Sequence, residues 1–175
     1  MRILKLLSLS LVIFLVGCAT TNEYLSVPII DKDISIGWKL GHQYREPFNA
    51  SNIREFVPNN ESIKNWSKLF TIQFIKKAKN KWDLALSIES KKHDLIKICP
   101  NLNWMIIETS NTSIIYEWKI KDCTGHANQH NIGRMFKGED GLHHVFFIAK
   151  TDQLDPNLKS NWLNSLKHST IKSIK

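Results

Sequence analysis

The chain has 175 residues, of which 42% are hydrophobic, and it carries 24 Lys and Arg against 16 Asp and Glu. This length and apolar content are typical of one compact domain and exclude an intrinsically disordered chain. Three cysteines, seven glycines and five prolines are too few for a disulfide-dense miniprotein, a collagen-like repeat or a Pro/Gly-rich low-complexity chain.

The beginning of the chain has the layout of a secretory signal peptide. Arg2 and Lys5 precede an apolar run over residues 6–16. At about 1.5 Å per residue this run is too short to cross the roughly 30 Å hydrocarbon layer of a membrane. We therefore expect residues 1–17 to be a signal that is removed during export.

The end of this run, Leu15-Val16-Gly17-Cys18, resembles a bacterial lipobox. The resemblance implies that Cys18 is lipidated and becomes the first residue of the mature protein. A thioether-linked diacylglycerol and an amide-linked acyl chain together suffice for stable anchoring. Residue 19 is alanine rather than the aspartate that favours inner-membrane retention. The expected location is therefore the periplasmic face of the Gram-negative outer membrane.

Residues 18–33 are expected to be the lipidated cysteine and a short tether, because they are polar and show no helical period. The folded body is then expected over residues 34–175 as a single domain. The mature chain stays basic, since only Arg2 and Lys5 leave with the signal. Besides the membrane that holds the lipid, the expected partner is an acidic envelope component or another envelope protein. Nucleic acid is not expected in the periplasm.

Alternating apolar residues predict three strands at the start of the body, over residues 34–41, 53–57 and 69–75. Ile34, Ile36 and Trp38 share one face of the first run, as a half-buried strand requires. Phe70, Ile72 and Phe74 share one face of the third. These strands precede the first helix.

The first helix is expected over residues 81–97, which contain no glycine or proline. Asn80 is a residue type favoured at helix N-caps. Leu84, Ile88 and Leu95 give this helix a narrow apolar stripe.

Two hairpins are expected next, over residues 104–123 and 130–150. In the first, Ile114, Tyr116, Trp118 and Ile120 are expected on one face of the second strand. The run over residues 142–150 is apolar on both faces, which is typical of a central strand. The adjacent His143 and His144 in this run are expected to point to opposite faces of the sheet. They therefore do not form a chelating pair.

A final helix is expected after Asp155-Pro156, which combines a favoured N-cap with proline at the first helical position. Leu158, Trp162 and Leu166 repeat every four residues and would dock this helix on the sheet. The order of elements predicts an α+β fold, with an antiparallel sheet of about six or seven strands and two main helices.

Two wider resemblances can be stated. The order of elements looks like the PsbP/Mog1-like arrangement, a likeness of topology that implies no activity. In addition, residues 56–62, 65–73 and 138–142 are similar to segments of an uncharacterised family of small exported bacterial proteins. No catalytic residue is assigned in that family, so this resemblance implies none here.

The common short signatures of catalysis do not occur in the sequence. His-Glu-x-x-His, Gly-x-Ser-x-Gly, a Gly-rich phosphate loop and Cys-x-x-Cys are all missing. A scattered triad stays open, but seven histidines and many serines give it no recognisable pattern. The expectation is therefore a protein without catalytic residues and without a cofactor.

The two cysteines that remain after lipidation, Cys99 and Cys123, are expected to form a disulfide in an oxidising compartment. Closing a loop of about 24 residues would stabilise the fold by roughly 3 to 4 kcal/mol. The alternative is a zinc or copper site built from Cys123, His126 and His130, with Cys99 as a fourth ligand.

Six tryptophans lie in the mature body, at positions 38, 66, 82, 104, 118 and 162. Their apolar positions favour core packing, with one or two left for a surface groove. Together these features predict a lipid-anchored cell-envelope protein that acts as a non-catalytic binding or accessory module. A metal-binding lipoprotein and an envelope hydrolase are the open alternatives.

Overall fold

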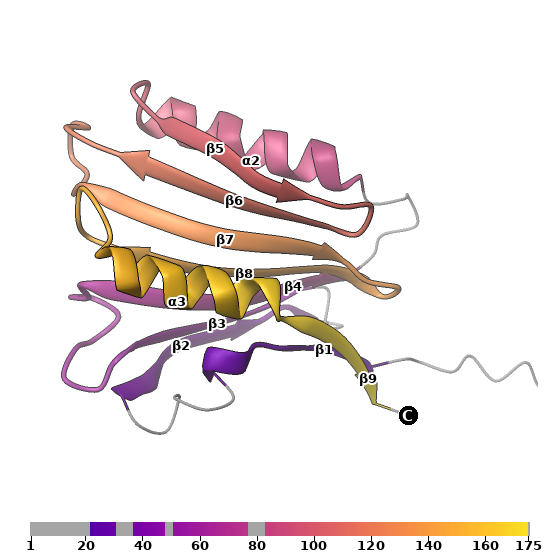
Figure 1. Ribbon diagram of the computed structural model, residues 1–175. Coiled ribbons are helices and arrows are strands. Elements are labelled where there is room, and N and C mark those ends of the chain that lie inside the picture. Colours follow the sequence, from indigo (N-terminus) through magenta and orange to yellow (C-terminus); the bar gives the residue numbers. More distant parts are fainter. Residues whose placement is uncertain (1–21, 31–36, 48–50, 77–82, 175) are drawn as a thin grey trace, which may run out of the picture.

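A seven-stranded antiparallel sheet forms the centre of the fold, in the order β2-β3-β4-β8-β7-β6-β5 (Figure 1). The structure is a computed structural model that describes residues 22–30, 37–47, 51–76 and 83–174. The strands are β2 Trp38–Arg45, β3 Ser51–Pro58, β4 Lys68–Lys76, β5 Asn103–Thr109, β6 Ser113–Ile120, β7 Gln129–Lys137 and β8 Gly141–Ala149. The predicted α+β class and antiparallel sheet are confirmed.

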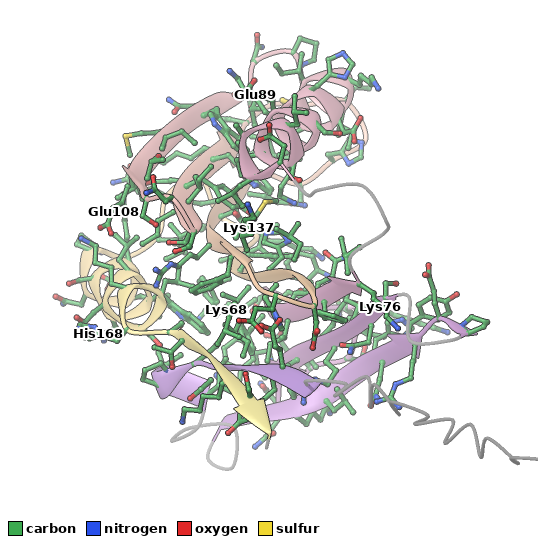
Figure 2. All side chains as sticks on the ribbon, turned by 90° about the vertical axis from the view of Figure 1, so that its right-hand side faces the viewer. Lys68, Lys76, Glu89, Glu108, Lys137 and His168 are labelled. Carbon is green, nitrogen blue, oxygen red and sulfur yellow. A yellow bond between two sulfur atoms is a disulfide. The ribbon has the colours of Figure 1, made fainter. Side chains whose placement is uncertain are left out.

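Two helices cover opposite faces of this sheet. α2 (Leu84–Ile98) connects β4 to β5 and packs over β6 and β7. α3 (Pro156–Lys167) follows β8 and packs on the other face. In Figure 2 the helix that carries Glu89 is α2, at the top, and the helix beside His168 is α3, at the left. We call the two sides of the sheet the α2 face and the α3 face.

Both helices begin at an aspartate cap. The carboxylate of Asp155 accepts hydrogen bonds from the backbone N–H groups of Asn157 and Leu158, each at 3.0 Å, as the Asp-Pro pair predicts. The carboxylate of Asp83 caps the first turn of α2 in the same way. The predicted cap of α2, Asn80, lies outside the described residues.

The alternation of side chains in the sheet is as predicted. Along β6, Ile114, Tyr116 and Trp118 belong to the core on the α2 face. β8 is paired on both edges and buried on both faces, with Val145 in the core of the α3 face and Ile148 in that of the α2 face.

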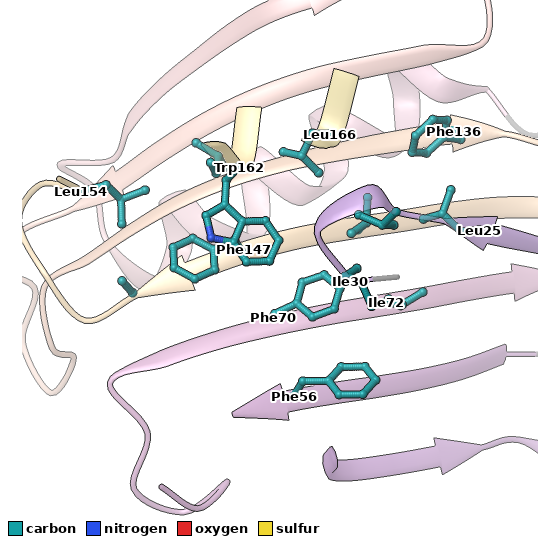
Figure 3. Packing of buried hydrophobic residues seen from close by; sticks show 14 residues of the cluster. Leu25, Ile30, Phe56, Phe70, Ile72, Phe136, Phe147, Leu154, Trp162 and Leu166 are labelled. Atoms are coloured by element: carbon teal, nitrogen blue, oxygen red, sulfur yellow. The ribbon is translucent and has the colours of Figure 1, made fainter. Parts of the chain in front are cut away.

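Aromatic stacking holds α3 against the sheet (Figure 3). The ring of Trp162 stacks on Phe147 of β8, with centroids 4.5 Å apart, and is tilted against Phe70 of β4 at 5.2 Å. Leu166, one helical turn later, is fully buried in the same cluster. The four-residue repeat in the sequence therefore forms the contact face of α3, as predicted.

A second, two-stranded sheet lies on the α3 face, where β1 (Asn22–Ser26) pairs with β9 (Thr170–Ile174) (Figure 1). Leu25, Val27 and Ile30 are buried in the core of that face. Residues 22–30 are therefore part of the folded body and not of a tether. The rest of the predicted tether, residues 18–21 and 31–33, lies outside the described residues.

The boundary of the body predicted at residue 34 is corrected by this pairing. β1 is too short to show a period, and its partner strand lies at the other end of the chain. The first predicted strand, residues 34–41, also differs, because β2 spans Trp38–Arg45 while residues 34–36 are outside the described residues. In the described part of the chain, no helix has the length and apolar character needed to cross a membrane.

Candidate functional site

A cavity of about 630 Å³ lies between α2 and the α2 face of the sheet, and we call it the α2 cavity. Its apolar wall consists of Ile75, Leu86, Leu95, Ile98, Met135 and Leu142. Gln73, Lys91 and His144 add polar groups from β4, α2 and β8. Because α2 packs over β6 and β7, the space beside it reaches β8 and β4. The volume falls within the range of about 300 to 1,000 Å³ that is typical of ligand pockets.

The polar group on the sheet side of the α2 cavity is His144, which is only 3% exposed. Its Nε2 lies 2.6 Å from the hydroxyl oxygen of Tyr116, and its Nδ1 lies 3.5 Å from Oε1 of Gln73. Since Gln73 Oε1 can only accept, Nδ1 carries the proton and the Tyr116 hydroxyl donates to Nε2.

Both members of this pair are neutral near pH 7. Burial raises the pKa of Tyr116 well above its ordinary value, so the hydroxyl keeps its proton. Burial also holds the pKa of His144 well below 6.5, and the positive charge of Lys91 acts in the same direction. The sheet side of the cavity is therefore polar but uncharged.

The contact between Tyr116 and His144 depends on Gly133. Tyr116 is on β6 and His144 on β8, and Gly133 of β7 lies between them as the register partner of Tyr116. A Cβ atom at Gly133 would lie 2.6 Å from the Tyr116 hydroxyl and 2.9 Å from Cβ of Phe146. Glycine therefore leaves the space through which the phenol crosses β7.

The positively charged group in the described cavity wall is Lys91 of α2, beside the carboxylates of Asp83 and Asp94. Its Nζ lies 5.0 Å from the ring centroid of Phe146, whose ring is in turn 4.7 Å from that of His144. Burial lowers the pKa of Lys91 to about 8, against the opposing effect of Asp94. Asp94 itself forms an ion pair with Lys97 at 3.1 Å.

The disulfide holds one end of the cavity wall. Cys99 caps the C-terminal end of α2 and is joined to Cys123, which follows β6, with Cα atoms 5.4 Å apart. The pairing predicted from the sequence is therefore present. Because Ile98 of the wall directly precedes Cys99, the bond fixes this end of α2 to the sheet.

The alternative metal site at Cys123, His126 and His130 is not assembled. The Cys123 sulfur is in the disulfide, and His126 is exposed in a turn. His130 is buried, with Nε2 2.7 Å from Glu117 Oε1, and its Nδ1 accepts the backbone N–H of Leu154 at 2.8 Å. In the described ranges no group of three or more His, Cys, Asp or Glu side chains is placed to hold a metal ion.

The two adjacent histidines do point to opposite faces, as predicted. While His144 lines the α2 cavity, His143 contacts the carboxylate of Glu23 on the α3 face, at 3.3 Å. The same carboxylate accepts the backbone N–H groups of Glu139 and Asp140, at 2.8 and 3.0 Å. These contacts join β1 to the turn between β7 and β8.

The described tryptophans pack in or against the core, and Trp66 and Trp38 in addition line two smaller surface pockets. Trp118 and Trp162 are buried, and Trp38, Trp66 and Trp104 pack against the two core clusters. None of these five described tryptophans lines the α2 cavity. Trp82 lies outside the described residues.

Sequence reasoning did not find Gln73, Lys91 and His144 as a site. The only signal was His144 itself, a polar residue within an apolar central strand. Gln73 and Lys91 are of common surface types in unremarkable positions. Their convergence depends on how α2 docks.

No protein-family model, no curated protein and no solved structure matches this chain. The resemblances to a lipobox, to a family of exported proteins and to the PsbP/Mog1-like topology therefore remain predictions. The candidate site rests on geometry.

Proposed function

We propose that this protein is a lipid-anchored binding module of the bacterial cell envelope, and that its ligand occupies the α2 cavity. The supporting observation is the cavity itself, with an apolar wall from α2 and the sheet and a few polar groups that converge on it. Small-molecule sites commonly combine an apolar lining with a few orienting polar groups in this way.

Binding, rather than catalysis, is proposed because His144, the histidine of the cavity, is engaged with Tyr116 and Gln73. Both ring nitrogens of His144 have partners, and Tyr116 keeps its proton. A general base needs an accessible acceptor and a pKa near the working pH, and the lowered pKa of His144 does not suit that role.

The proposed anchor is a lipid on Cys18, at the periplasmic face of the outer membrane. β1 starts at Asn22, so the four residues after Cys18 allow at most about 14 Å of extended chain between the lipid and the body. Asn22 pairs with Ile174. The end of the body formed by these two residues would therefore face the membrane. The basic composition of the chain supports an acidic envelope component as a partner.

Fractionation of a Cys18→Ser variant tests the anchor. We expect this variant to leave the membrane fraction or to accumulate unprocessed, because lipidation requires the thiol. Normal processing together with unchanged membrane association would contradict the lipoprotein proposal.

Binding of the neutral, apolar fluorophore N-phenyl-1-naphthylamine tests the cavity. The common background is the unlipidated Cys18→Ser chain. Ser87→Trp places an indole in the cavity lining, whereas His93→Trp adds the same indole at an exposed position of α2 that is not part of the lining.

We expect saturable binding that Ser87→Trp weakens at least about tenfold, equivalent to about 1.4 kcal/mol, and that His93→Trp leaves unchanged. Equal affinities of the two variants, or no saturable binding at all, would contradict a site in this cavity.

A further inference from the structure

The ammonium group of Lys91 lies in the α2 cavity without a fixed counter-ion. The neighbouring charges on α2 are paired elsewhere, Asp94 with Lys97 and Lys92 with Glu89. Among the described residues, no carboxylate lies within 4.0 Å of the Lys91 ammonium. Its close neighbour is instead the face of the Phe146 ring.

A charge in this position favours an anion as ligand. Burial lowers the pKa of Lys91 to about 8, which means that the surroundings do not fully replace the water lost by the ammonium group. An anion bound in the cavity would supply the missing opposite charge. It would also face a neutral His144 rather than a second cation.

The apolar part of the cavity favours a ligand with a hydrocarbon body. Leu86 and Ile98 line the cavity and are nevertheless 69% and 46% exposed. A chain bound towards the C-terminal end of α2 would cover Ile98, and each Å² of apolar surface removed from water contributes about 25 cal/mol. Ile75 and Leu142 continue the apolar wall on the sheet side.

The two carboxylates of the lining limit how much negative charge a ligand beside Lys91 can carry. Two carboxylates, Asp83 and Asp94, lie in the lining with the one lysine. Asp83 is held in place as the N-cap of α2, and Asp94 is held by its ion pair with Lys97. Both carboxylates therefore stay in the cavity lining when a ligand binds. A dianionic phosphate ester would meet more repulsion here than a monoanionic carboxylate.

We propose that the α2 cavity binds a fatty acid, with the carboxylate against Lys91 and the hydrocarbon chain along Leu95 and Ile98. This inference rests on the proposed function, since it names the ligand class of the same cavity.

Competition against the bound fluorophore separates the two proposals. Dodecanoate, dodecanol and dodecyl phosphate share one chain length and differ in the head group. They are compared on the parent chain, on Lys91→Met and on Lys92→Met, which removes the adjacent lysine outside the cavity lining. Thermal unfolding of each variant establishes that it is folded.

We expect dodecanoate to bind the parent chain about 10- to 100-fold more tightly than dodecanol, the range that one charged hydrogen bond supplies. Lys91→Met should abolish this difference, and Lys92→Met should preserve it. Dodecyl phosphate should bind more weakly than dodecanoate.

The fatty-acid inference would be overturned if dodecanoate and dodecanol bound the parent chain equally well. It would also be overturned if Lys91→Met kept the preference for dodecanoate over dodecanol. In either case the cavity would still be a binding site. Tighter binding of the phosphate would overturn the assignment of a monoanion. Absence of fluorophore binding would refute the proposed function, and the inference with it.

Discussion

Acidification should destabilise the folded protein, because three histidines are buried in a neutral form. His130, His143 and His144 are each less than 4% exposed, and burial lowers the pKa of each below 6.5. At His130 the geometry adds a reason, since protonation of Nδ1 would break its hydrogen bond with the backbone N–H of Leu154. Below pH 6.5 the unfolded chain therefore binds protons that the folded protein does not, and the free energy of unfolding falls with the pH.

The size of this effect follows from proton linkage. A histidine that stays neutral in the folded state lowers the free energy of unfolding by about 1.4 kcal/mol between pH 7.5 and 5.5, so three of them set an upper limit of about 4 kcal/mol. Glu117 and Glu23 favour the charged form of His130 and His143 and reduce their share. His144 has the positive charge of Lys91 nearby instead, so it should contribute its full loss of unfolding free energy.

The two carboxylates act in a separate pH window. Hydrogen bonds from Lys159 and His130 outweigh burial and lower the pKa of Glu117, and backbone N–H groups do the same for Glu23. Their stabilisation is complete above pH 4.5 and is lost as the pH falls through the lowered folded-state pKa values. A loss between pH 7.5 and 5.5 therefore reports on the histidines.

Urea unfolding followed by tryptophan fluorescence at pH 7.5 and 5.5 measures this loss. We expect the loss of unfolding free energy between pH 7.5 and 5.5 to be about 1.4 kcal/mol smaller in His144→Gln than in the parent protein. His126→Gln, at an exposed position, should show the same loss as the parent protein. Equal stability at both pH values, or the same loss in His144→Gln as in the parent protein, would refute the reasoning.

Three further perturbations test the fold. Replacing Cys99 and Cys123 together with serine should lower the free energy of unfolding by about 2 to 5 kcal/mol, and an unchanged melting temperature without reductant would contradict a native disulfide. Leu25→Ala should lower the free energy of unfolding, measured with urea, by about 2 to 5 kcal/mol because Leu25 of β1 is part of the core. An unchanged free energy of unfolding would show instead that this segment is a tether. His130→Ala should cost about 1 to 3 kcal/mol because the buried backbone N–H of Leu154 loses its acceptor and Glu117 keeps only its lysine partners. His126→Ala should change the melting temperature little without any added metal.

Much of the local structure was determined by the sequence alone. The alternation in β6 assigned Ile114, Tyr116 and Trp118 to one face correctly, because successive side chains of a strand point to opposite sides. The start of α3 followed from Asp155, because a cap is satisfied by N–H groups within the next turn. Such signals lie within a few residues of the structure that they specify.

Only the tertiary structure decided that residues 22–26 pair with residues 170–174. β1 pairs with β9 across almost the whole length of the chain, and the carboxylate of Glu23 is held by backbone groups of Glu139 and Asp140. Neither contact produces a recognisable hydrophobic periodicity in the sequence around residue 22. Residues 22–30 therefore resembled a tether in the sequence although they are part of the folded body.

The α2 cavity also arises only in the assembled fold. Lys91 and His144 belong to different elements, and Gly133 on a third strand makes room for the partner of His144. Periodicity specifies which side of a helix or strand is apolar. Which element covers that side is selected by long-range packing, in which the gain from burial must exceed the entropy cost of closing the intervening loops.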